Sequence, residues 1–224
     1  MTPTPTSATP PAVARFLELK PLVREAAEWR LLGLLLERPY GAWWREIRAL
    51  APEIFDPGLR AAIAGAARAS ESAYLAVVGP GASVNLRSTA HRRSSDPGHL
   101  FAELRDMFAA FGFDPRREES VDHASVLCGF VAYLRLKEAA SRAGDDPEAA
   151  DLTARVAATV IHDHLAMLAE PVCQSLFERE AGYLALTAQA LVERTGRRPS
   201  DVEGGWAPDG LIPADLTEDE VTCG

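Results

Sequence analysis

The stretch from Glu118 to Leu134, EESVDHASVLCGFVAYL, constrains the fold more than any other part of the chain. It opens with two acids and a serine, which suit the free backbone N–H groups and the positive dipole at the start of a helix. The residues that follow place apolar side chains at helical spacing: Val121, Ala124, Val126, Leu127, Phe130, Val131 and Leu134. So broad an apolar stripe is typical of a helix buried on most of its surface. We therefore predict a central helix here, around which the other elements pack.

An adjacent polar pair, Asp122 and His123, stands at the start of this apolar run. In the simpler interpretation, Asp122 is an acid of the first helical turn and His123 is an ordinary surface imidazole. Capping a helix does not require an Asp-His pair, however, so a functional role for both residues is the alternative hypothesis.

The same 3.6-residue periodicity runs through the rest of the chain, and no segment alternates as a strand does. Three of the helix boundaries are predicted from helix-terminating residues: Pro39, Gly112 and Pro171. The expected helices, besides the central one ending near residue 144, are 21–37, 41–50, 57–78, 97–111, 148–169 and 172–195. The sequence thus predicts an all-α, single-domain bundle over residues 13–195.

Three segments lack such periodicity. Residues 1–12 are rich in Thr and Pro and are expected to be a disordered tail. Residues 196–224 contain two Arg and seven acids, which predicts an acidic tail, disordered or loosely draped. Residues 82–98 are polar and are expected to form a long flexible loop, in which Arg92 and Arg93 are a solvated pair rather than an export signal.

The charge balance limits the kinds of partner. The formal net charge is −9 and the sequence pI is about 5.1. Because nucleic-acid affinity comes largely from Lys and Arg neutralising phosphates, a nucleic-acid partner is not expected, whereas a basic partner is. The N-terminal residues lack a secretory pattern, no apolar run is long enough for a membrane span, and the three cysteines form no CxxC pair. These features favour a cytoplasmic protein without stable membrane association.

No arrangement of residues for catalysis or metal binding is evident. His162 and His164 lie two positions apart and so point to different sides of a helix, whereas helical zinc sites use His at i and i+4. Phosphate-binding loops, dinucleotide fingerprints and nucleophile elbows are missing from the sequence. Cys128 lies on the apolar stripe, as expected for an inert buried thiol. We therefore expect neither an enzyme nor a metal or cofactor site.

Three sequence blocks, in order, resemble the TorD/DmsD/NarJ family of cytosolic chaperones for molybdenum-containing oxidoreductases. Residues 73–81, AYLAVVGPG, resemble the family's apolar helix end that runs into Gly-Pro. Residues 119–123, ESVDH, are similar to its E-x-x-D-H signature. Residues 164–183, which contain His164-Leu165 and Tyr183, resemble its penultimate and final helices. The resemblance spans residues 25–195.

The sequence departs from the family pattern at aromatic positions. Asn85 stands where the family has an aromatic after Gly-Pro, Leu168 where an aromatic is common, and Gly182 where Phe precedes Tyr183. These differences suggest a divergent branch with its own client.

The resemblance implies a TorD-like chaperone that binds the twin-arginine signal peptide, or an N-terminal segment, of a catalytic subunit. That subunit would belong to a molybdenum-containing oxidoreductase of the DMSO-reductase type and would be held until its cofactor is loaded. Such a peptide carries Arg before an apolar run, so its receptor needs an apolar groove with carboxylates at one end. Asp122 is expected to meet a guanidinium and His123 a peptide carbonyl, with Glu119 beside them. Val77, Pro80 and Val84 are expected to form the groove wall.

Two other functions remain open at this point. An all-α transcriptional regulator would use its short N-terminal helices as a helix-turn-helix, but residues 1–60 carry eight Lys and Arg against seven acids, without a basic footprint. An accessory subunit retained in the mature enzyme is the other alternative. The sequence is compatible with a monomer or a homodimer.

Overall fold

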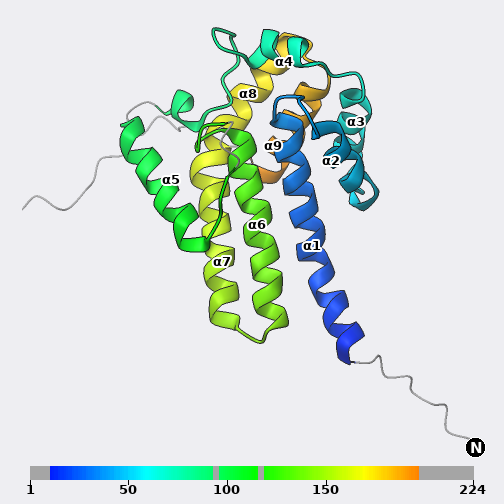
Figure 1. Cartoon of the computed structure of the whole chain (residues 1–224), viewed down its shortest axis with the longest axis vertical. Coiled ribbons are helices and arrows are strands. Elements are labelled where there is room, and N and C mark those ends of the chain that lie inside the picture. The colour runs from blue at the N-terminus through cyan, green and yellow to red at the C-terminus, as the bar shows by residue number, and fades with distance from the viewer. Residues whose placement is uncertain (1–10, 93–95, 116–118, 197–224) are drawn as a thin grey trace, which may run out of the picture.

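The computed structural model describes residues 11–92, 96–115 and 119–196, with side chains from residue 17 onward. These residues form an all-α fold in which the one β feature is an isolated bridge between Arg87 and His123, so the predicted fold class is confirmed. Figure 1 shows the helices gathered around α1 and α6. They are α1 (Pro11–Leu36), α2 (Trp43–Leu50), α3 (Pro57–Ala66), α4 (Glu71–Val78), α5 (Pro97–Phe111), α6 (Ala124–Ala143), α7 (Pro147–Thr159), α8 (Ala166–Glu178) and α9 (Tyr183–Thr195). Two 3-10 turns, Ala51–Glu53 and Ser88–His91, and a π-helical turn, Val160–Leu165, complete the described elements.

Three helices begin at an Asp-Pro pair, which explains their sharp starts. Asp56, Asp96 and Asp146 cap α3, α5 and α7, each accepting a hydrogen bond from a first-turn N–H. The proline that follows each Asp lacks an N–H and has its φ fixed near the helical value, so it suits the first helical position. These boundaries are therefore encoded locally.

The core is built on the antiparallel pair α1 and α6, which lie side by side in Figure 1. Gly33 of α1 approaches the backbone of α6 so closely that a Cβ there would lie 2.9 Å from the carbonyl oxygen of Ser125. Trp29 of α1 and Leu127 and Phe130 of α6 are fully buried in the core. Helix α7 packs on α6, and α9 packs on α8 and α3, which closes one continuous apolar core.

Several predicted boundaries were wrong. Helix α1 begins at Pro11 rather than Pro21, and passes through Pro21 because the carbonyl of Leu17, which loses its helical partner, lies on the exposed side. The predicted helix 57–78 is two helices, because the Ser70 side chain accepts a hydrogen bond from the Ala73 N–H and starts α4 anew. Residues 1–10 and 197–224, which hold most of the two predicted tails, lie outside the described residues.

The predicted helix boundary at Pro171 was also wrong, since α8 continues through it to Glu178. The chain turns instead between α8 and α9, where Glu180 and Gly182 have φ values of 51° and 56°. A glycine adopts this left-handed conformation without steric cost, so Gly182 was the better boundary signal.

The expected flexible loop after α4 is instead a packed segment, which we call the strap (residues 82–92). Val84, Leu86 and Ser88 of the strap are buried. The strap's alternating exposure resembles that of a short strand, and its backbone lies against the start of α6. Its polar sequence hid this role, because only every second side chain faces the core. No helix in the described ranges is both long and apolar enough to cross a bilayer.

Candidate peptide-binding site

The strap, which directly follows the first sequence block, is hydrogen-bonded to the loop before α6, which carries the second block. The N–H of Ser88 donates to the Asp122 carbonyl at 2.9 Å, and the N–H of Ala124 donates to the Leu86 carbonyl at 2.8 Å. Helix α6 consequently begins at Ala124, six residues later than predicted, and residues 119–123 are a structured turn. Neither Asp122 nor His123 lies in the first helical turn.

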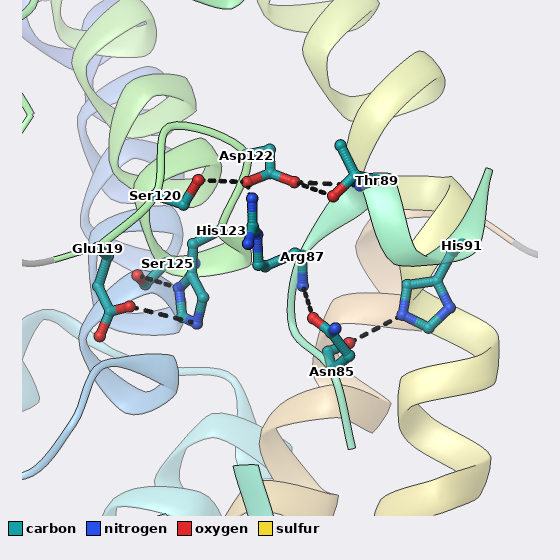
Figure 2. Close-up of polar contacts among 9 residues, drawn as sticks. All are labelled: Asn85, Arg87, Thr89, His91, Glu119, Ser120, Asp122, His123 and Ser125. Carbon is teal, nitrogen blue, oxygen red and sulfur yellow. Dashed lines mark hydrogen bonds and ion pairs between the residues drawn. The ribbon is translucent and has the colours of Figure 1, made fainter. Parts of the chain in front are cut away.

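Asp122 is fully buried, and its carboxylate is surrounded by donors from its own chain (Figure 2). The hydroxyls of Ser120 and Thr89 donate at 2.6 Å each, and the Thr89 N–H and the Arg87 Nε donate at 3.1 Å each. Burial alone would raise the pKa of Asp122, but the hydrogen bonds from Ser120, Thr89 and Arg87 outweigh it and hold the pKa below its ordinary value. Asp122 is therefore ionised and already paired with a guanidinium, that of Arg87.

His123 caps α6 from a buried position. Its Nδ1 accepts from the Ser125 N–H at 3.3 Å and lies 2.7 Å from the Ser125 hydroxyl. Burial lowers the pKa of His123 to about 4, against the opposing effect of the Asp122 charge. The ring is thus neutral at pH 7, and because Nδ1 accepts, its proton is on Nε2. That atom lies 3.9 Å from a Glu119 carboxylate oxygen, too far for a strong hydrogen bond.

The side chain of Asn85 makes a local hydrogen bond that an aromatic side chain at this position could not make. Its side-chain oxygen accepts from the Arg87 N–H at 3.0 Å, and its carbonyl lies 2.8 Å from Nε2 of His91 (Figure 2). These contacts hold the strap's exposed edge next to the Arg87–Asp122 pair.

The strap also reaches the third sequence block. Arg92 donates to the backbone carbonyl of Asp163 and lies 3.0 Å from Nδ1 of His164, both in the π-helical turn. His164 is buried, and burial together with the positive charge of Arg92 lowers its pKa. Arg92 is therefore a structural contact, and the expectation of a solvated arginine was wrong for it, whereas Arg93 lies outside the described residues.

The residues predicted to form the groove wall lie where the strap meets the end of α4. Val84 is buried and its N–H donates to the Val77 carbonyl at 3.4 Å, while Val77 is half-buried and Pro80 is exposed. None of the three lines the large groove described below, and neither do Asp122 and His123. Glu119 does line it, with a side chain 30% exposed. Peptide binding by this residue set remains a prediction.

A large apolar groove runs along the contact between α1 and α6, and we call it the α1–α6 groove. It encloses about 980 Å³, within the size range of ligand pockets. Phe55, Leu136 and Val23 expose 58%, 50% and 47% of their surface there, which is unusual for large apolar side chains. The other apolar residues that line it include Ala26, Ala27, Trp43, Leu50, Phe113, Val126, Ala132, Tyr133, Ala139 and Ala140.

The charges of the groove are distributed along its length. Glu37, Asp114 and Glu119 line the end beside the start of α6 together with Arg30 and Arg38, whereas Lys20 and Arg24 line the end beside residues 136–140. Glu53 also lines the groove. Sequence reasoning found Glu119 but missed the groove itself. The available signal was the series of small residues on α6, Gly129, Ala132, Ala139 and Ala140, which leaves room next to α1.

The histidines and cysteines of the described residues lie apart from one another. No three His, Cys, Asp or Glu side chains among them are grouped as metal ligands. His162 is exposed and pairs with Asp163, while His164 is buried, so the two imidazoles diverge as predicted. Burial raises the pKa of the Cys128 thiol, which makes it a poor nucleophile.

Comparison with known proteins identifies the family. No curated protein and no solved structure gives a significant match. The family model described as nitrate reductase delta subunit matches residues 64–181, more than half of the chain. That range contains α4, the strap, the start of α6 and the π-helical turn, and so covers the first two sequence blocks and most of the third. The chain therefore belongs to the nitrate reductase delta subunit family, the NarJ/TorD-type chaperone family that its sequence blocks resemble.

Proposed function

We propose that this protein is an assembly chaperone that binds the signal peptide or N-terminal segment of a molybdenum-enzyme catalytic subunit in the α1–α6 groove. Its family is one of molybdoenzyme assembly chaperones, which mature other enzymes and do not catalyse a reaction. The observation that carries the proposal is an apolar groove with carboxylates at one end, of which Glu119 belongs to the signature block. The chaperone would act in the cytoplasm, before its client is exported or assembled.

The groove fits a peptide in which Arg precedes an apolar run. Exposed Phe55, Val23 and Leu136 offer apolar surface that water covers in the free protein. Burying such surface contributes about 25 cal/mol per Å². An Arg of the peptide would reach Glu119, where a charge-assisted hydrogen bond contributes about 1.5–3 kcal/mol. Asp122 and His123 would stabilise the start of α6 without contacting the peptide.

Fluorescence anisotropy with a labelled synthetic peptide, Arg-Arg followed by twelve apolar residues, tests this function. Glu119→Gln is expected to weaken binding by roughly 10–150-fold, because each 1.4 kcal/mol is a factor of ten. Leu136→Arg should weaken it by at least about tenfold by placing a charge on the apolar wall. Leu152→Arg is the matched control, since Leu152 of α7 is 49% exposed and lies outside the groove.

The peptide would bind elsewhere if Leu136→Arg and Leu152→Arg lost the same amount of peptide affinity. The same would follow if Glu119→Gln and Leu136→Arg both kept full affinity. The strap side with Val77, Pro80 and Val84 is the site predicted from sequence, so Pro80→Arg is the variant to measure next.

A further inference from the structure

One end of the α1–α6 groove carries positive charge without a counterion in the described part of the chain. Lys20 and Arg24 are exposed and line the groove, and no carboxylate among the described residues lies within ion-pair distance of either. The Arg24 guanidinium instead lies 4.5 Å from the centre of the Phe55 ring. At the opposite end, Arg30 is paired with both Glu37 and Glu46.

Ion pairs hold the last turn of α9 close to the cationic end of the groove. Arg194 donates to Glu28 of α1 at 3.0 Å and lies 3.3 Å from Asp56. Glu28 is one helical turn from Arg24, and Asp56 directly follows Phe55. The last turn of α9, at Arg194, therefore lies near Phe55 and Arg24, while Gly196 itself lines a shallow surface between α8 and α9.

That segment, residues 197–224, has the composition that complements the groove. It contains seven acids and two Arg, and its four large apolar residues are Trp206, Leu211, Ile212 and Leu216. Four of the acids follow within nine residues of Leu211. The fifteen residues from Gly196 to Leu211 can span up to roughly 50 Å, so chain length does not limit the contact.

We propose that residues 206–220 of the same chain dock in the cationic end of the α1–α6 groove. The apolar side chains cover Val23, Phe55 and Leu136, and the carboxylates meet Lys20 and Arg24. A tethered segment has an effective concentration of the order of 1 mM, so a weak intrinsic affinity suffices, and a second copy at micromolar concentration competes poorly. The contact does not depend on the proposed function. Where the proposed function also holds, the segment and a client peptide compete for the same apolar surface.

Paramagnetic broadening in the full-length protein tests the contact directly. A nitroxide is attached to Cys223 in a Cys173→Ser background, in which the fully buried Cys128 is protected. Amide signals of residues 17–27 and 132–140 are expected to broaden at low protein concentration. Lys20→Glu with Arg24→Glu should abolish the broadening. Arg155→Glu with Arg179→Glu makes the same charge change at exposed cations outside the groove and should leave it intact.

Three results would overturn the proposal: no broadening in the groove, broadening that survives Lys20→Glu with Arg24→Glu, or loss of broadening in the control as well. Nitroxide-bearing unlabelled protein mixed with isotope-labelled protein distinguishes the partner. Broadening in that mixture would reject the contact within one chain and identify a second copy.

The Arg-Arg peptide separates this proposal from the proposed function. Saturating peptide is expected to remove the broadening, and Leu211→Ser with Ile212→Ser and Leu216→Ser should tighten peptide binding by about tenfold for an intrinsic Kd near 0.1 mM. Groove-bound peptide that leaves the broadening unchanged would overturn the docking. If no peptide binds while the broadening persists, the proposed function fails and the docking stands.

Discussion

At the scale of single residues, Asp122 and His123 differ from their sequence-based interpretation because both are buried. Asp122 was expected to await a client guanidinium, but Arg87 of the same chain already occupies that position. His123 was expected to face a peptide, but its Nδ1 caps α6. The pair holds the strap against the start of α6, and its removal should first affect stability.

Asp122→Asn is expected to lower the free energy of unfolding by about 1–3 kcal/mol, since an amide cannot accept from four donors and leaves buried donors unpaired. Asp146→Asn is the control, because Asn caps a helix about as well as Asp and should change little. Urea unfolding measures both. The peptide affinity of the folded Asp122→Asn protein should stay the same. A large loss of affinity at unchanged stability would show instead that Asp122 contacts the peptide.

His123 should make stability depend on pH between about 6.5 and 4. Because the folded pKa is about 4 and the ordinary value is 6.5, the unfolded chain binds a proton in this range that the folded chain does not. Stability is therefore full above pH 6.5 and falls by about 3 kcal/mol as the pH drops to 4. Asp122, whose pKa is lowered, adds a loss only below about pH 4.

His123→Asn keeps a capping side chain and should remove most of this pH dependence, which urea unfolding at pH 7.5, 5.5 and 4.5 would measure. Gln174→Asn, at an exposed amide that carries no titratable proton, is the control and should leave the pH dependence unchanged. If the free energy of unfolding of His123→Asn depends on pH as strongly as before, another group is responsible, and buried His164 is the next residue to test.

At the scale of elements, the α1–α6 contact decides where the groove lies. The two helices approach closely at Gly33 and are separated farther along by the groove, where α6 carries small residues. Glu25 of α1 and Arg135 of α6 bridge the helices at 2.9 Å beside the groove. The groove is thus a consequence of residue size along one helix pair.

Gly33→Ala and Gly129→Ala should change stability in opposite directions. Alanine favours a helix over glycine by about 1 kcal/mol at both positions. A Cβ at Gly33 would lie 2.9 Å from a backbone oxygen of α6, so overpacking of about 1–3 kcal/mol should outweigh that gain. A Cβ at Gly129 would meet its nearest atoms at 3.9 Å, an ordinary contact. Urea midpoints measure both variants, and stabilisation by Gly33→Ala would show a looser α1–α6 contact.

At the scale of the whole molecule, the strap joins parts of the chain that are far apart in sequence. It contacts the start of α6 through Asp122 and the π-helical turn through Arg92. The block before the strap is tied to α1, where the Tyr74 hydroxyl donates to the Leu36 carbonyl at 2.9 Å. The three sequence blocks are therefore one connected structure, and their first role is to hold the helices around the α1–α6 contact.

The sequence by itself determined the fold class, the starts of α3, α5 and α7, and the family. Asp-Pro caps, Gly112 and the helical periodicity act through neighbours a few residues apart, so they can be read locally. Glu119 lines an apolar groove, although not the one expected with Val77, Pro80 and Val84, and its role in binding stays a prediction.

Only the tertiary structure decided which polar residues are buried and where the groove lies. Arg87 meets Asp122 across 35 positions of sequence, and Arg92 meets His164 across 72. No local pattern encodes such pairings, because they depend on how complete helices pack. The groove likewise arises where two helices that are more than 100 residues apart fail to fill the space between them, as the Glu25–Arg135 bridge beside it shows. Residue size and periodicity fix the helices, but the spaces between helices are a property of their packing.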